Sequence, residues 1–184
     1  MNATYAYFTA SARAADGTAT TATLQIAVSE DTAGLINSST VTSSTKLIPG
    51  DILTIDGSVV NKGNVQAYVI LELTISSTKA GASSSTTEEH VFYSLSGSNL
   101  IELTGSNKTY SVNAFVVDPP NANSSNVFSK DFNINYTFDF YHYDNTYKNA
   151  TVIYTLTAHA IQTANISDAA TATELLLEKA NSAT

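Results

Sequence analysis

The sequence predicts an all-β protein, a jelly-roll-like antiparallel β-sandwich with a short C-terminal helix. Alternation of apolar and polar side chains dominates the chain, and Phe132–Phe140 is the clearest example. Residues that favour turns separate the alternating segments, and a helical pattern occurs only near the end, in Ser167–Ala180. Strands at this spacing, with no helices between them, are typical of sandwiches and barrels. The length of 184 residues fits a single domain.

The predicted strands follow one another from the N-terminus. The aromatic segment Ala3–Ala10 comes first, and the apolar run Leu24–Val28 belongs to the second strand. Leu53, Ile55 and Val59 alternate with polar residues, as a half-buried strand requires. The candidates after the first strand are 18–29, 53–59, 69–75, 90–95, 100–103, 110–117, 132–140 and 151–161.

Gly, Pro and Asn mark the connections between these strands. They favour turns because Gly and Asn tolerate a positive φ and Pro fixes φ. The segments concerned are Pro49-Gly50, Asn61-Lys62-Gly63, 81–87, 97–99, 105–107 and Pro119-Pro120. We expect Ser76–Thr87 to be a loop or flexible arm, because Ser and Thr dominate it. In the helix, Ser167 is the expected N-cap, Asp168 lies in the first turn, and Leu176 is among the apolar residues.

Composition excludes several classes of partner. The formal net charge is -8 and only eight residues are Lys or Arg, whereas nucleic-acid binding needs clustered basic residues. We therefore expect no nucleic-acid partner. No apolar run reaches about 18 residues, so we expect no membrane insertion. The chain has no Cys, which excludes disulfides, thiol nucleophiles and Cys-based zinc sites.

Three histidines are the candidate metal ligands of an enzyme: His90, His142 and His159. None has the His-Glu-x-x-His spacing of a helical zinc protease site. The chain also has no Gly-x-Ser-x-Gly nucleophile motif. We therefore favour histidines on strand faces or at the surface, and expect neither an enzyme nor a cofactor. A metalloprotease that uses these histidines is the alternative.

Four of the ten tyrosines lie close together in the sequence, at positions 136, 141, 143 and 147. Such a cluster serves a sandwich core, which we favour, or a surface on which sugars stack. A surface adhesin or carbohydrate-binding module is therefore a further alternative.

Candidate glycosylation sites carry the Asn-x-Ser/Thr pattern. They are Asn37, Asn107, Asn123, Asn135, Asn149 and Asn165.

The N-terminal segment 1–12 is set apart from the predicted sandwich domain, residues 13–184. Burial of an aromatic side chain contributes about 1.5–3 kcal/mol, and an extended strand also carries unpaired backbone groups that seek a sheet edge. That edge belongs either to the same sandwich or to another copy of the chain. The candidate pairing residues are Tyr5, Ala6, Tyr7, Phe8, Thr9 and Ala10.

The order of segments resembles the mature N-terminal half of the TasA/camelysin family of secreted fibre proteins. The segments that carry the resemblance are the aromatic head, Leu24–Val28, Pro49-Gly50-Asp51, Val60-Asn61-Lys62-Gly63 and, near the end, Tyr154–Gln162. It implies a subunit of a biofilm-matrix or pilus-like filament, located in the extracellular matrix or at the cell surface. The N-terminal strand of each copy would complete the sheet of the next.

The resemblance also implies the partners and the processing of the chain. The partners would be other copies of the chain, with an anchor or accessory protein as a further one. Met1 would stand where a signal peptide has been removed. A camelysin-like metalloprotease activity is the alternative function, although the sequence lacks the motif for it.

Overall fold

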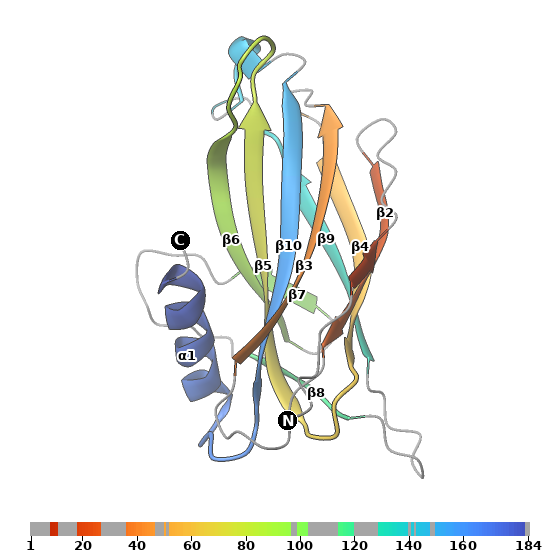
Figure 1. Ribbon diagram of the computed structural model, residues 1–184, viewed down its shortest axis with the longest axis vertical. Helices are drawn as coiled ribbons and strands as arrows, with labels where there is room; N and C mark the ends of the chain where they lie inside the picture. The colour runs from red at the N-terminus through yellow and green to blue at the C-terminus, as the bar shows by residue number, and fades with distance from the viewer. Residues whose placement is uncertain are drawn as a thin grey trace.

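The computed structural model shows two β-sheets packed face to face, with one helix on the outer side of the larger sheet (Figure 1). This confirms the all-β class and the helix near the C-terminus. The residues that the structure describes are 8–10, 18–26, 36–46, 50, 52–96, 99–102, 114–119, 129–139, 141, 143–147 and 150–182.

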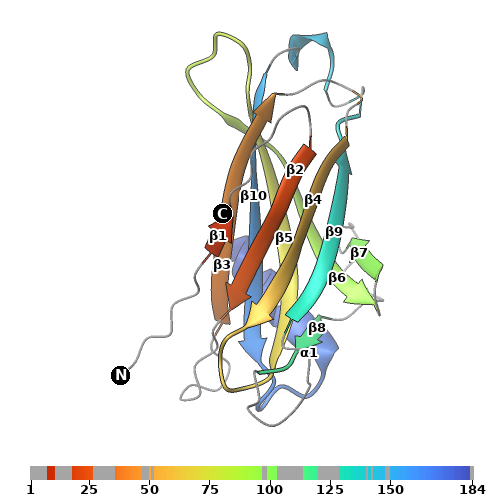
Figure 2. The same ribbon diagram turned by 90° about the vertical axis from the view of Figure 1, so that its right-hand side faces the viewer.

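The smaller sheet has four strands in the spatial order β1-β2-β4-β9. It faces the viewer in Figure 2. Its strands are β1 (Phe8–Ala10), β2 (Thr18–Ile26), β4 (Ile52–Asn61) and β9 (Ser129–Thr137). The strands β1 and β9 are therefore the two edges of this sheet.

The larger sheet has six strands, five of them in the order β3-β10-β5-β6-β7. The sixth, β8, pairs with β5 at Ala67–Val69, and β6 pairs with the following part of β5, from Leu71 onward. The bounds are β3 (Ile36–Lys46), β10 (Thr151–Gln162), β5 (Ala67–Thr78), β6 (Thr86–Ser96), β7 (Asn99–Glu102) and β8 (Phe115–Val117).

One strand pair departs from the antiparallel arrangement that the sequence predicts. Among the described pairs, β2 and β4 alone run parallel. The strand between them in the chain, β3, belongs to the other sheet, so the chain returns to the smaller sheet in its original direction. The described strand pairs are otherwise antiparallel, as predicted, and this pair is the exception.

The main core lies between the two sheets and follows the alternation read from the sequence. In β5, residues at positions 69, 71, 73 and 75 are buried, while Glu72, Thr74 and Ser76 point to the other face and are half-buried. The facing residues of β9 are Phe132, Ile134 and Tyr136, all at most 8% exposed. Period-2 alternation thus assigned the inner faces of these strands correctly.

One strand of the structure was not predicted, and one predicted loop is shorter than expected. The strand β3 was not predicted, because its sequence is mostly Ser and Thr and offers no apolar alternation. It forms through backbone pairing with β10, which runs from Thr151↔Lys46 to Ile161↔Ile36. The expected loop Ser76–Thr87 is present but shorter, because β5 continues to Thr78 and β6 begins at Thr86, which leaves 79–85 as the connection. Thr and Ser are compatible with strands when they lie on an outer face.

The turn at Asn61-Lys62-Gly63 connects β4 and β5, as the sequence predicts. The buried Asn61 side chain fixes it: Nδ2 donates to the carbonyl oxygens of Val65 at 2.7 Å and Val117 at 3.0 Å, and Oδ1 accepts from the Gly63 amide at 2.8 Å. All three contacts satisfy buried or half-buried polar groups. This segment therefore has a structural role.

The helix α1 (Ala169–Ser182) packs against the outer face of the six-stranded sheet. Its N-cap is Asp168 and not Ser167, because Asp168 Oδ1 accepts a hydrogen bond from the Thr171 amide at 2.8 Å. A second apolar cluster forms beneath it. The cluster contains Ile70, Phe92, Ala114, Ile161, Ala172, Leu176, Leu177 and Ala180.

Two neighbouring leucines of α1 provide a test of this second cluster. Leu176 is 0% exposed and Leu175 is 36% exposed. We expect Leu176→Ala to lower the free energy of unfolding by about 2–5 kcal/mol, because it removes buried methyl groups and leaves a cavity. Leu175→Ala should change it by less than about 0.5 kcal/mol. Urea denaturation followed by circular dichroism measures both, and equal effects would contradict the docking of α1.

Candidate functional site

The structure places part of the N-terminal segment at the edge of a sheet of its own chain. Phe8, Thr9 and Ala10 form β1, which pairs antiparallel with β2 in the register Phe8↔Leu24, Thr9↔Thr23 and Ala10↔Ala22. The other candidate residues, Tyr5, Ala6 and Tyr7, lie outside the described residues. The described part of the segment is thus an edge strand of its own sandwich, which is one of the two placements that the sequence left open.

The strand β1 lies at one side of the sandwich, where an edge of the smaller sheet lies near an edge of the larger one. In the four-stranded sheet β1 is outermost, beyond β2. It also approaches β3, the edge strand of the six-stranded sheet (Figure 2). This strand therefore pairs with β2 of its own sheet and lies near the edge of the other sheet.

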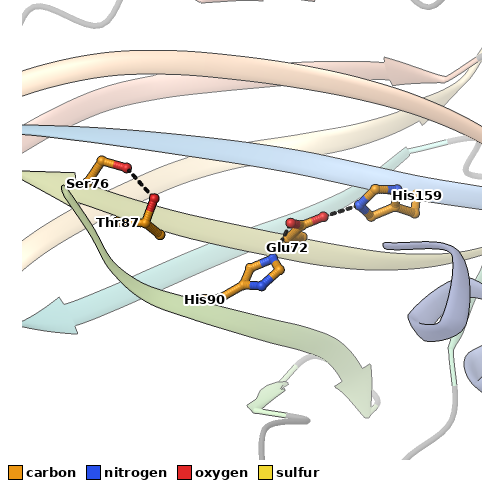
Figure 3. A network of polar contacts seen from close by, with 5 residues as sticks. All are labelled: Glu72, Ser76, Thr87, His90 and His159. Carbon is orange, nitrogen blue, oxygen red and sulfur yellow. Dashed lines mark hydrogen bonds and ion pairs between the residues drawn. The ribbon is translucent and has the colours of Figure 1, made fainter. Parts of the chain in front are cut away.

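A His–Glu–His cluster lies on the outer face of the six-stranded sheet (Figure 3). Glu72 is on β5, His90 on β6 and His159 on β10. His90 is in register with Thr74, and His159 with Ile70, so the two histidines flank Glu72 diagonally from opposite strands. In this way the sheet brings together residues that are far apart in the sequence.

Each histidine occupies its own oxygen of the Glu72 carboxylate. His90 Nε2 donates to Oε1, and His159 Nε2 donates to Oε2. The side chains are partly shielded from water, with exposed fractions of 25% for His90, 13% for Glu72 and 9% for His159. The His90 ring also lies 4.8 Å, centroid to centroid, from Phe92, which belongs to the cluster under α1.

Burial raises the pKa of Glu72, but the two histidines outweigh it. Their hydrogen bonds, from His159 first and then His90, and their positive charge when protonated hold the pKa below the ordinary value of 4.5. The ionised form of Glu72 is thus more stable in the folded protein than in the unfolded chain. The cluster therefore links the strands β6 and β10 to β5 most strongly while Glu72 is charged.

The described residues offer no metal centre. No group of three or more His, Cys, Asp or Glu among them is arranged to hold a metal ion. Two of the histidines that the sequence singled out, His90 and His159, do lie together, and His142 lies outside the described residues. Sequence reasoning missed Glu72, which appeared only as a polar position of an alternating strand.

The tyrosine-rich stretch is mainly part of the core. Tyr143 is 0% exposed, and its hydroxyl lies 3.0 Å from that of Tyr136. Its ring meets Phe138 edge to face at 5.2 Å and Tyr147 at 5.4 Å. Tyr147, in the short 3-10 helix Asn145–Tyr147, also lies under the Lys79 ammonium at 4.2 Å. In contrast Tyr141 is fully exposed.

The candidate glycosylation sites occupy different environments. Asn135 lies on the exposed face of β9, where its Nδ2 donates to Asn133 and its Oδ1 accepts from Thr54 at 2.9 Å. Asn165 is exposed in the turn before α1, with a φ of 63°. Asn37 belongs to β3. The remaining three, Asn107, Asn123 and Asn149, lie outside the described residues.

Comparison of the chain with protein-family models, with curated proteins and with solved structures finds no match. The resemblance to the TasA/camelysin family therefore stays a prediction from the sequence. Across the described residues, no helix is both long and apolar enough to cross a membrane.

The lowered pKa of Glu72 predicts how stability depends on pH. Because the folded-state pKa is below the unfolded value of 4.5, the contribution of Glu72 is present above that pH. It is lost as the pH falls through the folded pKa. We expect Glu72→Gln to lower the free energy of unfolding by about 1–3 kcal/mol at pH 6, with a difference from the wild type that shrinks below pH 4.5.

Thermal and urea denaturation between pH 3 and pH 7 measure this difference. The matched control is Glu178→Gln, because Glu178 is an exposed carboxylate on α1. A loss in Glu72→Gln that is the same at every pH would contradict the electrostatic account. It would leave only the packing of the side chain as the cause.

The aromatic stretch offers a matched pair of variants that separates a core from a sugar-binding surface. We expect Tyr143→Ala to lower the free energy of unfolding by about 3–5 kcal/mol, because the ring is buried among other rings. Tyr141→Ala should change it by less than about 0.5 kcal/mol. Denaturation measures both, and a glycan array probed with wild type and Tyr141→Ala tests the one exposed ring among these four positions.

Proposed function

We propose that the chain is a secreted structural subunit of an extracellular or cell-surface filament. Copies join head to tail when the N-terminal strand of one adds to the sheet of the next. The observation that carries this proposal is β1, the described part of the aromatic N-terminal segment, which is a three-residue strand at the outermost position of its sheet. The sequence resemblance to a family of fibre proteins supports the same function.

The contacts of β1 make exchange between copies feasible. The strand pairs with β2 through three residues at the outermost position of its sheet. Strand addition relies on main-chain hydrogen bonds, which any copy of the same segment can form. Because the donor strand and the acceptor edge are different surfaces, the contact between copies is head to tail, and repeated addition gives an open filament when the rotation between copies does not close a ring.

The composition supports an assembly role over a catalytic one. Charged residues make up 13% of the chain and hydrophobic residues 43%. Hydroxyl and amide side chains therefore keep the surface polar, a balance that is common in exported proteins and less so in cytosolic enzymes. The metalloprotease alternative has no observation in its favour, since the two clustered histidines share a carboxylate and no metal centre is found among the described residues.

Removal of the N-terminal segment tests the proposal. We expect the purified full chain to form filaments and a variant lacking residues 1–10 to remain monomeric, because it has lost the donor strand. Electron microscopy and light scattering measure assembly, and circular dichroism checks that the sandwich remains folded. A peptide of residues 3–10 should bind the truncated variant, whereas a scrambled peptide should not.

Two results would overturn the proposal. Filaments from the truncated variant, as abundant as those of the full chain, would show that another surface drives assembly. A full chain that stays monomeric at every concentration, salt and pH tested would leave a sandwich with no polymer to build.

A further inference from the structure

We propose that the acceptor site for the incoming strand is the same β2 edge that β1 covers in its own chain, in the same antiparallel register. This inference rests on the proposed filament function and specifies its contact. The subunit would then start as a self-capped chain. Its β1 must leave β2 before β2 can receive the strand of a neighbour.

The register supports this choice of edge. In the chain itself, Thr9 lies opposite Thr23, with Phe8 opposite Leu24 and Ala10 opposite Ala22. An identical strand from another copy can form the same main-chain hydrogen bonds there, so the exchange replaces each lost bond with an equivalent one. Swapping an identical element between copies is a low-cost route to assembly for this reason.

The length of β2 also allows an incoming strand longer than β1 to pair with it. The strand β2 runs from Thr18 to Ile26, whereas β1 pairs with Ala22–Leu24. An incoming strand that keeps the same register would bring Tyr7 opposite Gln25 and Ala6 opposite Ile26. The edge of β2 therefore has room to pair with residues 6–10 of the incoming segment, out to the end of β2.

The surroundings of this edge favour it over the other edges. On its far side β2 pairs with β4, so an added strand continues a sheet that already has a packed inner face. On its near side, β1 approaches β3, the edge of the six-stranded sheet. A strand added here takes the place that β1 holds beside β3, whereas the opposite edge strand, β9, already lies beside β7 of the larger sheet (Figure 2).

Two consequences follow for assembly. The β1 strand in its own chain competes with the incoming strand, so self-capping inhibits the free subunit. Release of β1 from β2 is then a required step. A variant whose β1 is covalently held on its own β2 should fold and yet never enter a filament.

Engineered cysteines test this contact cleanly, because the natural chain has no Cys. Directly opposed residues of antiparallel strands have Cα atoms about 4.5–5.5 Å apart, within the range of about 4.4–6.8 Å that a disulfide spans. Filaments would be grown from an equal mixture of the single variants T9C and T23C and then oxidised. We expect a disulfide-linked dimer on a non-reducing gel. The control mixture, T9C with T137C on the β9 edge, should give none.

The double variant T9C/T23C tests the self-capped state. Oxidised as a monomer, it should lose filament formation, and reduction should restore it. The pair A10C and A22C repeats both measurements at the next position of the register, in case one pair disturbs folding. Unhindered assembly of the oxidised double variant would overturn the inference.

The outcomes separate this inference from the proposed function. Suppose that wild-type filaments form. If T9C then links to T137C, or if neither T9C with T23C nor A10C with A22C gives a linked dimer, the filament stands and the β2 acceptor is wrong. If the wild-type chain forms no filament, the proposed function itself falls, and the β2 acceptor with it.

Discussion

The pairing of β10 with its two neighbours is the constraint on which the rest of the structure depends. Along its full length β10 pairs with β5 on one side, from Thr151↔Thr78 to Gln162↔Ala67, and with β3 on the other. Its inner residues, Val152, Tyr154 and Leu156, are at most 1% exposed. The centre of the larger sheet is therefore complete only when a strand near the end of the chain is in place. The pairings of β10 join parts of the sequence that are far apart.

The outer face of the same three strands carries the second layer of organisation. His159 and Ile161 lie two residues apart on β10, the first in the His–Glu–His cluster and the second under α1. Glu72 and Ile70 have the same relation on β5. A polar cluster and an apolar cluster thus adjoin on one face. The ionised Glu72 accepts from both histidines, and the helix excludes water beside it.

The two edge strands of the smaller sheet, β1 and β9, differ in length and in side-chain hydrogen bonding. The edge strand β9 is long, and its exposed face carries Asn133 and Asn135, joined to each other and to β4 by side-chain hydrogen bonds. The other edge strand, β1, is short and belongs to the N-terminal end of the chain. Natural sheets protect an exposed edge because unpaired backbone groups recruit other strands. Here the protecting element is itself a strand, and in the proposed filament another copy would supply it.

Local sequence pattern determined the elements that have one buried face. Alternation located the inner residues of β4, β5 and β9 and the helix α1, because side-chain direction in a strand or helix follows from position alone. Turn chemistry located the Asn61-Lys62-Gly63 connection, since Asn and Gly tolerate the required backbone. In the N-terminal segment, strand-favouring residue types predicted a strand, and its described part, Phe8–Ala10, is one.

Tertiary structure alone decided what depends on partners far away in the chain. The Ser- and Thr-rich β3 has no apolar alternation and becomes a strand because β10 supplies its hydrogen bonds. The parallel β2–β4 pair results from β3 joining the opposite sheet. Glu72 acquires its two histidines only when β6 and β10 flank β5. Sequence fixes which way a side chain points along its strand, whereas register between distant strands decides which side chains meet.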